Sequence, residues 1–153
     1  MLHRLYCHIV WTTRERQPLL DAGLARFLCR FLRGVARQER AHLLEIGMVR
    51  THVHVLVRLH PTTNVSRLLQ RWKGGSAAVA GKERHSTEGR RLRWAKGYSI
   101  HSVSPRHLAA LRAYLRAQVQ HHPGETIPGW PGDDPEFDRS GTDEWRSELR
   151  HPL

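Results

Sequence analysis

The chain has 153 residues, enough for one domain with a sizeable core and too few for two ordinary domains. No apolar run approaches the length of a membrane span, and the N-terminus is too charged for a secretory signal, so we expect a cytoplasmic protein without membrane contact. The two cysteines, Cys7 and Cys29, lack metal-binding spacing, which predicts reduced core thiols.

Charge is divided unevenly along the chain. Residues 1–123 hold 22 Lys and Arg against 6 Asp and Glu, whereas residues 124–153 hold 3 against 8. Arginine predominates, and its planar fork matches phosphate oxygens, so a polyanionic partner is favoured. An arginine-rich proteome is the alternative that composition leaves open. We predict a basic domain over 1–123 and an acidic, Pro/Gly-rich C-terminal tail over 124–153.

Hydrophobic periodicity predicts the elements in chain order. Residues Leu5 to Thr13 alternate as in a strand, and Leu19 to Arg40 show an apolar stripe at helical spacing. The stretch Arg50 to Leu59 is rich in β-branched residues and follows a predicted strand at His42 to Arg50 almost directly, so the two should pair as a hairpin. Predicted after them are a helix at 65–80, a charged loop at 81–93, a strand at 94–103, a helix at 105–121, an extended linker at 124–141 and a short helix at 143–149.

The order strand, helix, strand, strand, helix, strand, helix indicates the α+β class. It predicts a ferredoxin-like antiparallel four-stranded sheet with two crossover helices, plus an additional C-terminal helix.

Two histidines stand in the predicted strand 50–59. His52 and His54 alternate with valines, so both imidazoles leave the sheet on one side, with attachment points about 6.5 to 7 Å apart. Two neutral ring nitrogens can then converge on one small cation or phosphate. Among 12 histidines, about one His-x-His pair is expected by chance, so the pair needs a partner elsewhere in the chain.

The last predicted helix supplies that partner. Tyr114, Gln118 and His121 are spaced at i, i+4 and i+7, which places a phenol, an amide and an imidazole along one line. The alternative is a tyrosine at the boundary of the apolar face and a plain surface amide. The apolar stripe beside this line consists of Leu108, Leu111, Leu115 and Val119.

The motif His52-Val53-His54 on a strand, followed by a helix with Tyr114-x-x-x-Gln118-x-x-His121-His122, resembles the insertion-sequence-200-like single-tyrosine transposases of the HUH nuclease superfamily. The resemblance covers about residues 3–122. It implies a transposase domain over 1–123 that cleaves and rejoins single-stranded DNA at hairpin-bearing element ends through a 5′-phosphotyrosine intermediate.

The resemblance also implies roles for individual residues. Tyr114 would be the nucleophile, and His52, His54 and Gln118 would hold Mg²⁺ or Mn²⁺, with His121 in a supporting position beside them. The expected assembly is a homodimer in which Tyr114 of one subunit serves the histidine pair of the other. Thr51 stands where many relatives carry an acidic residue, so one interaction behind the metal ligands is expected to be missing.

Basic and aromatic side chains are predicted to contact the DNA, because cations neutralise phosphates and rings stack on bases. Core packing is the alternative for each aromatic side chain. We also hypothesise that the acidic tail lies against the basic DNA face and weakens nonspecific binding. The predicted DNA contacts are Arg67, Arg71, Lys73, Arg93, Lys96, Trp72, Trp94 and Tyr98.

Other functions stay open at this point. A ferredoxin-like module that binds nucleic acid without catalysis would need only the basic and aromatic residues. A small metal-dependent hydrolase would use the histidine pair in another way. Within the transposase interpretation, a chromosomal relative that processes repeated palindromes without moving itself is a further case.

Overall fold

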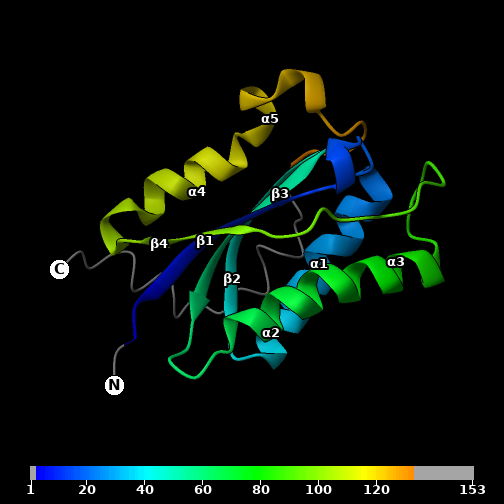
Figure 1. Cartoon of the computed structure of the whole chain (residues 1–153). Coiled ribbons are helices and arrows are strands. Elements are labelled where there is room, and N and C mark those ends of the chain that lie inside the picture. Colours follow the sequence, from blue (N-terminus) through cyan, green and yellow to red (C-terminus); the bar gives the residue numbers. More distant parts are fainter. Residues whose placement is uncertain (1–2, 133–153) are drawn as a thin grey trace.

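The computed structural model describes residues 3–132, except for the side chains of Val119 and Gln120. Four antiparallel strands form one sheet in the order β2-β3-β1-β4, which confirms the predicted α+β fold (Figure 1). The strands are β1 (Leu5–Thr12), β2 (His42–Val49), β3 (His52–Leu59) and β4 (Ser99–Val103). The α-helices are α1 (Ala22–Gln38), α2 (Val65–Gln70), α3 (Ser76–Glu83), α4 (Leu108–Arg116) and α5 (Gln118–His121).

The two faces of the sheet carry different helices. Helices α1, α2 and α3 lie on one face, and α4 lies across the other (Figure 1). The first face holds the main core, where Cys7, Ile9 and Trp11 of β1 and the valines of β3 meet the apolar stripe of α1, whereas Leu5 is exposed. A smaller cluster under α4 consists of Tyr6, Leu44, Leu56, Leu108 and Leu115.

Helix α1 begins later than periodicity predicts, at Ala22 instead of Leu19. Asp21 is the reason, because its carboxylate accepts a hydrogen bond from the Leu24 backbone N–H (2.9 Å) and caps the helix. Both thiols agree with expectation, since Cys7 is half-buried and Cys29 is buried. In the described residues, no helix has the length and apolarity needed to cross a membrane.

The second predicted helix runs further than expected, through a wide π-helical turn at Arg71–Gly75 and on to Glu83. Trp72 lies inside this turn and is fully buried, with its indole N–H donating to the Leu32 carbonyl (2.8 Å). The prediction that Trp72 stacks on DNA bases is therefore wrong, because the ring belongs to the core.

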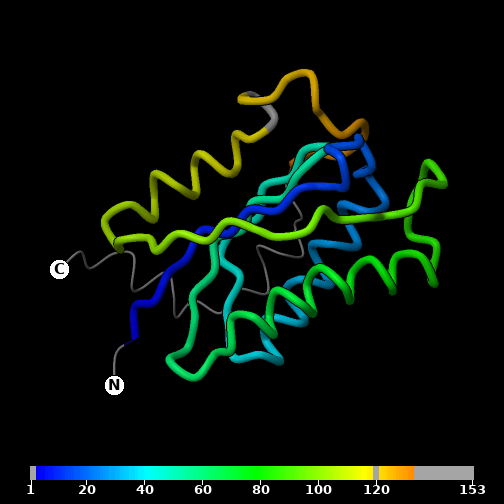
Figure 2. Tube along the Cα trace, in the orientation of Figure 1, coloured from blue at the N-terminus to red at the C-terminus, as the bar shows by residue number. Residues whose placement is uncertain are grey.

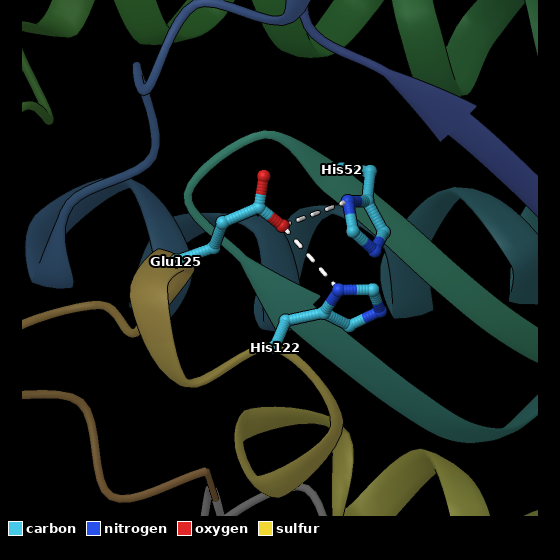
Figure 3. A group of neighbouring side chains, drawn as sticks. All are labelled: His52, His122 and Glu125. Carbon is cyan, nitrogen blue, oxygen red and sulfur yellow. Dashed lines mark ion pairs between the residues drawn. The ribbon is translucent and has the colours of Figure 1, made fainter.

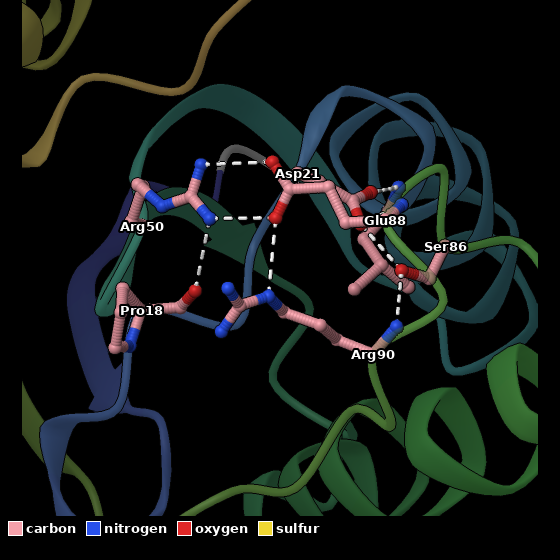
Figure 4. Close-up of polar contacts among 7 residues, drawn as sticks. Pro18, Asp21, Arg50, Ser86, Glu88 and Arg90 are labelled. Carbon is pink, nitrogen blue, oxygen red and sulfur yellow. Dashed lines mark hydrogen bonds and ion pairs between the residues drawn. The ribbon is translucent and has the colours of Figure 1, made fainter.

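The segment after α3 is fastened to the domain, although its charge predicted a solvated loop. Figure 2 shows the chain turning back after α3 and running towards β4. Buried Asp21 accepts hydrogen bonds from the Ser86 hydroxyl and the Glu88 N–H, and Glu88 forms ion pairs with Arg50 (2.7 Å) and Arg90 (3.2 Å), as Figure 4 shows. Burial acts to raise the pKa of Asp21, but these hydrogen bonds outweigh it and leave the pKa lowered.

The strand predicted at 94–103 and the helix predicted at 105–121 are less regular than expected. The strand predicted at 94–103 is regular only from Ser99, because Trp94 forms just an isolated bridge with Thr13. The helix predicted at 105–121 is divided into a 3-10 turn at Pro105–His107, α4 and α5, with a break at Ala117 (φ −90°, ψ 17°). The predicted role of Val119 in the apolar stripe lies outside the described side chains.

The chain beyond α5 does not form the predicted extended linker over the residues that the structure describes. A 3-10 turn at Pro123–Glu125 leads to Ile127 and Trp130, which are 1% and 9% exposed and belong to the main core. These two large apolar side chains anchor a segment whose Pro and Gly content suggested otherwise. The division at residue 123 stays a prediction, and the helix predicted at 143–149 and the remaining tail lie outside the described residues.

Two glycines of α1 give a matched test of this packing. A Cβ at Gly23 would lie 2.2 Å from the His85 carbonyl oxygen, whereas a Cβ at Gly34 would have no neighbour within 4 Å. We expect Gly23→Ala to lower the free energy of unfolding by about 1 to 3 kcal/mol through overpacking. Gly34→Ala should raise it by about 0.5 to 1 kcal/mol through helix propensity. Urea unfolding of both variants checks the pair, and a Gly23→Ala variant as stable as the parent would contradict the close contact.

Candidate active site

The histidine pair lies on the α4 side of the sheet. Val53, Val55 and Val57 fill the main core, so His52 and His54 leave β3 on the opposite face. Their ring centroids are 5.0 Å apart. His52 is 4% exposed and His54 is half-buried, so both imidazoles lie largely under the helical layer.

Gln118 begins α5 and points down to this pair. Its amide Nε2 lies 3.2 Å from His52 Nε2, and the side chain is 1% exposed. Its Oε1 is buried, and within the described part of the chain no hydrogen-bond partner reaches it. Gly47 of β2 allows this approach, because a Cβ there would lie 2.7 Å from the Leu115 carbonyl oxygen.

A buried ion-pair cluster holds α4 on the sheet. Glu45 is 6% exposed, and its Oε2 accepts from the Nε–H groups of Arg112 and Arg116, both at 3.0 Å. The pairing register shifts between Leu43 and Glu45, and this bulge turns both Leu44 and Glu45 towards α4. Burial raises the pKa of Glu45, while the two guanidinium groups oppose that rise.

His8 is a member of the site that the sequence did not suggest. It lies on β1, and its Nε2 is 2.9 Å from His54 Nδ1, so one of these nitrogens donates to the other. The two rings also stack at 5.1 Å. The sequence alone does not give the register between β1 and β3, in which Val10 pairs with His54. This register places His8, two residues before Val10, on the same face of the sheet as His54.

Two residues after α5 complete the cluster, and neither was predicted as a ligand. His122 Nδ1 and His52 Nδ1 lie 3.6 Å and 3.9 Å from Glu125 Oε2, and potential ligand atoms of these three residues lie within 4.8 Å of one another (Figure 3). Thr51 Oγ1 donates to Glu125 Oε1 (3.0 Å) and lies 2.9 Å from His52 Nδ1. Only long-range folding brings Glu125 to β3, so no local sequence signal could have shown it.

The imidazoles are held neutral near pH 7. Burial, followed by the neighbouring His52, His8 and His122, lowers the pKa of His54 to about 3. Burial is also the main reason why the pKa of His52 is lowered. Neutral imidazoles keep a nitrogen lone pair, as a ligand to a cation must.

The donor set therefore fits a divalent cation. Neutral ring nitrogens and the buried Oε1 of Gln118, which is left without a partner among the described residues, lie on the Nε2 side of His52, and the carboxylate of Glu125 lies on its Nδ1 side. A mixture of nitrogen and oxygen donors suits transition metals such as Mn²⁺ better than Mg²⁺, which prefers oxygen.

Tyr114 lies near this cluster but does not join it. Its side chain is 41% exposed, and its ring stacks on His121 at 4.4 Å. Within residues 3–132, no hydrogen bond or ring contact links Tyr114 to His52 or His54. His121 was expected beside the metal ligands, but it packs against Tyr114, and His122 contacts the ring of His52 instead (4.9 Å).

The predicted DNA contacts fall into two groups. Arg67 and Arg71 form ion pairs with Glu39, and Lys73 donates to backbone carbonyls of residues 95 and 97, so these cations have structural partners. Trp94 is half-buried against Trp11 and donates to the Ser76 hydroxyl (2.9 Å). The exposed members of the predicted set are Arg93, Lys96 and Tyr98, together with Arg67.

Comparisons with known proteins identify the family of this chain. A family model described as transposase, IS200-like, matches residues 1–118. The ISDra2 transposase TnpA of Deinococcus radiodurans strain R1 is 26% identical over 121 residues, which are 76% of this chain and 86% of that protein.

Two solved structures share the fold. A crystal structure of a transposase candidate from Deinococcus radiodurans R1 has a TM-score of 0.58 and 23% identity, covering 83% of this chain and 95% of its own. The structure of a REP-associated tyrosine transposase bound to a REP hairpin has a TM-score of 0.62 and 13% identity, covering 99% of this chain and 84% of its own.

The four-stranded antiparallel sheet carries the histidine pair beneath α4 with Tyr114 and α5 with Gln118, and the matching family is that of the single-tyrosine transposases of the HUH superfamily. The chain belongs to the IS200-like transposase family, as its motifs indicated. Membership implies DNA cleavage and strand transfer.

The low pKa of His54 predicts acid sensitivity. Between pH 6.5 and about 3 the unfolded chain protonates His54 while the folded chain does not, so the free energy of unfolding falls as pH falls. Each proton contributes a slope of about 1.4 kcal/mol per pH unit, and the stability is fully present above pH 6.5. We expect His54→Asn to have a shallower pH dependence than the parent in urea unfolding between pH 4 and 7. His107→Asn, at an exposed histidine, is the control, and equal slopes in parent and His54→Asn would contradict the assignment.

Proposed function

We propose that this protein cleaves and rejoins single-stranded DNA by attack of Tyr114 on a phosphodiester. One observation carries the proposal: the amide of Gln118, one turn after Tyr114, is buried against His52 in a cluster of neutral nitrogen and oxygen donors. The fold brings this phenol-bearing helix and the histidine pair to the same face of the sheet, which a pure binding module does not require.

The proposed reaction follows from the chemistry of the phenol. Tyr114 Oη forms a bond to the scissile phosphorus and loses its proton, and the bond to the 3′ oxygen breaks, which leaves a 5′-phosphotyrosine and a 3′ hydroxyl. A phenol with a pKa near 10 is a weak nucleophile at pH 7, so charge developing on the phosphate must be stabilised. Attack by a 3′ hydroxyl on the phosphotyrosine reverses the step and rejoins a strand.

We assign His52, His54 and Gln118 as the residues that hold a divalent cation, Mg²⁺ or Mn²⁺. Bound there, it would polarise the scissile phosphate and stabilise the departing oxygen. His8 orients His54 through their 2.9 Å hydrogen bond. The helical layer over the pair limits access of water, as the 4% exposure of His52 indicates.

The proposed substrate is single-stranded DNA with hairpins. The segment that leads into β4 exposes Arg93, Lys96 and Tyr98. The two cations can neutralise DNA phosphates, and the aromatic ring can stack on an unpaired base. A structural neighbour of the same fold is bound to a REP hairpin, which makes palindromes a sensible first substrate and keeps the palindrome-processing case in view. A non-catalytic module is the alternative function that the following experiment addresses.

Covalent trapping tests the proposal. Hairpin DNA labelled at its 3′ end should give a protein–DNA adduct on a denaturing gel in the presence of Mn²⁺, whereas a 5′ label should be released in a free strand. Tyr114→Phe should lose the adduct and keep hairpin affinity, because only the hydroxyl is removed. Hairpin binding with no adduct from the parent protein, across a library of flanking sequences, would support the non-catalytic module instead.

The homodimer with shared sites stays a prediction. Contacts within the chain favour the other placement, in which Tyr114 serves its own histidine pair. Arg112 and Arg116 bind Glu45 of the same sheet, and Gln118 is already buried against His52 of the same chain. A helix that moved to a second copy would have to leave these contacts and form the same ones on the partner's sheet.

Mixing two inactive variants decides between the placements. Tyr114→Phe and His54→Ala should stay inactive when they are refolded together if the tyrosine acts within its chain. In a dimer with shared sites, random pairing makes half of the dimers mixed with one complete site each, so adduct formation would recover to about a quarter of the parent level. Recovery near that level would overturn the within-chain placement. Size-exclusion chromatography of the same mixture reports whether a dimer is present.

A further inference from the structure

The hydroxyl of Thr51 lies between a carboxylate and an imidazole. Thr51 Oγ1 is 3.0 Å from Glu125 Oε1 on one side and 2.9 Å from His52 Nδ1 on the other. Thr51 is 5% exposed and His52 is 4% exposed, so their contact is buried, whereas the contact with Glu125 is part-buried, because that side chain is 33% exposed. In Figure 3, Glu125 reaches this point from the turn that follows α5, and His52 from the start of β3.

The number of available protons determines which atom donates in each of these two hydrogen bonds. A threonine hydroxyl has one proton, and an ionised carboxylate can only accept, so Thr51 donates to Glu125. Its oxygen can then only accept from the ring, which requires a proton on His52 Nδ1. A neutral imidazole with Nδ1 protonated carries its lone pair on Nε2.

The contact at the other ring nitrogen of His52 is consistent with a proton on Nδ1. Gln118 presents its amide Nε2 to His52 Nε2 at 3.2 Å, and an amide nitrogen can only donate, so His52 Nε2 is the acceptor. The same amide has its Oε1 buried without a partner among the described residues. Rotation of the Gln118 amide group by about 180° would exchange its nitrogen and oxygen. Its Oε1 would then lie beside His52 Nε2, where both atoms could bind one cation.

We infer that Glu125 and Thr51 are positioning residues that hold His52 in the Nδ1–H tautomer and thereby leave Nε2 as its ligand atom. The inference rests on the proposed function, since it names how one proposed metal ligand is oriented. A metal-binding histidine commonly donates a hydrogen bond from its other ring nitrogen, and this bond fixes the tautomer and the orientation of the ring. Loss of the acceptor typically weakens metal binding about 10- to 100-fold.

Glu125 is held in place independently of Thr51. The Glu125 carbonyl accepts from the Arg50 backbone N–H (2.8 Å), and its own N–H donates to the His122 carbonyl (3.0 Å). Two residues that follow Glu125 in the chain, Ile127 and Trp130, are themselves buried in the main core. The carboxylate is therefore presented by a fastened turn, so its side chain can be shortened without releasing the segment.

A different use of the same residues is conceivable on distance alone. His52, His122 and Glu125 lie close enough to share a cation, which would then bind His52 through Nδ1. The contact with Thr51 opposes that arrangement, because a protonated Nδ1 has no lone pair to offer. The two arrangements predict opposite tautomers of His52, which makes them separable by experiment.

The tautomer can be read directly in the metal-free protein. Long-range ¹H–¹⁵N spectra of the histidine-labelled chain at pH 7.5, with His52 assigned by its loss in His52→Gln, should show a protonated Nδ1 and an unprotonated Nε2. Thr51→Val keeps the shape of the side chain and removes the hydroxyl, so His52 should populate both tautomers. Thr51→Ser keeps the hydroxyl and should retain the parent spectrum. An Nε2–H tautomer in the parent would overturn the inference.

Mn²⁺ affinity, followed by electron paramagnetic resonance, gives the second readout. Thr51→Val and Glu125→Ala should each bind Mn²⁺ about 10- to 100-fold more weakly. The double variant should be no weaker than either single one, because both residues act through one chain of hydrogen bonds. Thr126→Ala, at the neighbouring exposed residue, is the matched control and should bind as the parent does. Parent affinity in a folded Thr51→Val variant, with unchanged circular dichroism and Tm, would overturn the inference.

Failure of the two proposals is distinguishable. A parent protein that binds no Mn²⁺ and forms no adduct would overturn the proposed function, while the metal-free spectra would still decide the tautomer. A parent that forms the adduct, with Thr51→Val equal to it in both readouts, would overturn only the role of Thr51 and Glu125.

Discussion

The position of α4 and α5 on the sheet depends on one buried carboxylate, Glu45. Two arginines of α4 donate to a single oxygen of this group, so the helix is fixed to β2 at two successive turns. Removing the carboxylate would leave the largely buried guanidinium of Arg112 without this partner beside an apolar cluster, which costs more than losing an exposed ion pair, whereas Arg116 is 49% exposed and stays solvated. Gly47, two residues further along β2, then allows the end of α4 to approach the backbone closely. Together these contacts determine how near Gln118 comes to the histidine pair.

Local patterns were sufficient for most of the fold. Strands with alternating valines and a helix with a regular apolar stripe were predictable, because period and burial are local properties of the sequence. The ends of the helices were less predictable. The capping contact of Asp21 makes α1 begin at Ala22, and the break at Ala117 divides the last predicted helix into α4 and α5. Neither depends on hydrophobic pattern, which is why pattern alone placed these ends imprecisely.

The site was predictable only where a local pattern or the family resemblance indicated its parts. His52 and His54 follow from strand alternation, and Gln118 followed from a resemblance to a family. His8 needed the register between β1 and β3, and Glu125 needed the return of the chain after α5. Trp72 shows the converse case, since its aromatic ring on a basic helix suggested a nucleic-acid contact but lies wholly in the core.

The return of the chain after α5 has a consequence for where this protein can be divided. The match to the family ends at residue 118, yet Glu125, Ile127 and Trp130 lie beyond that point and contact the first half of the chain. A fragment trimmed to the matched segment would leave a cavity in the main core, where Ile127 and Trp130 pack, and would remove the hydrogen-bond acceptor of the Arg50 backbone N–H. The segment that the family model matches and the segment that is needed to close the interior are therefore two different lengths of polypeptide.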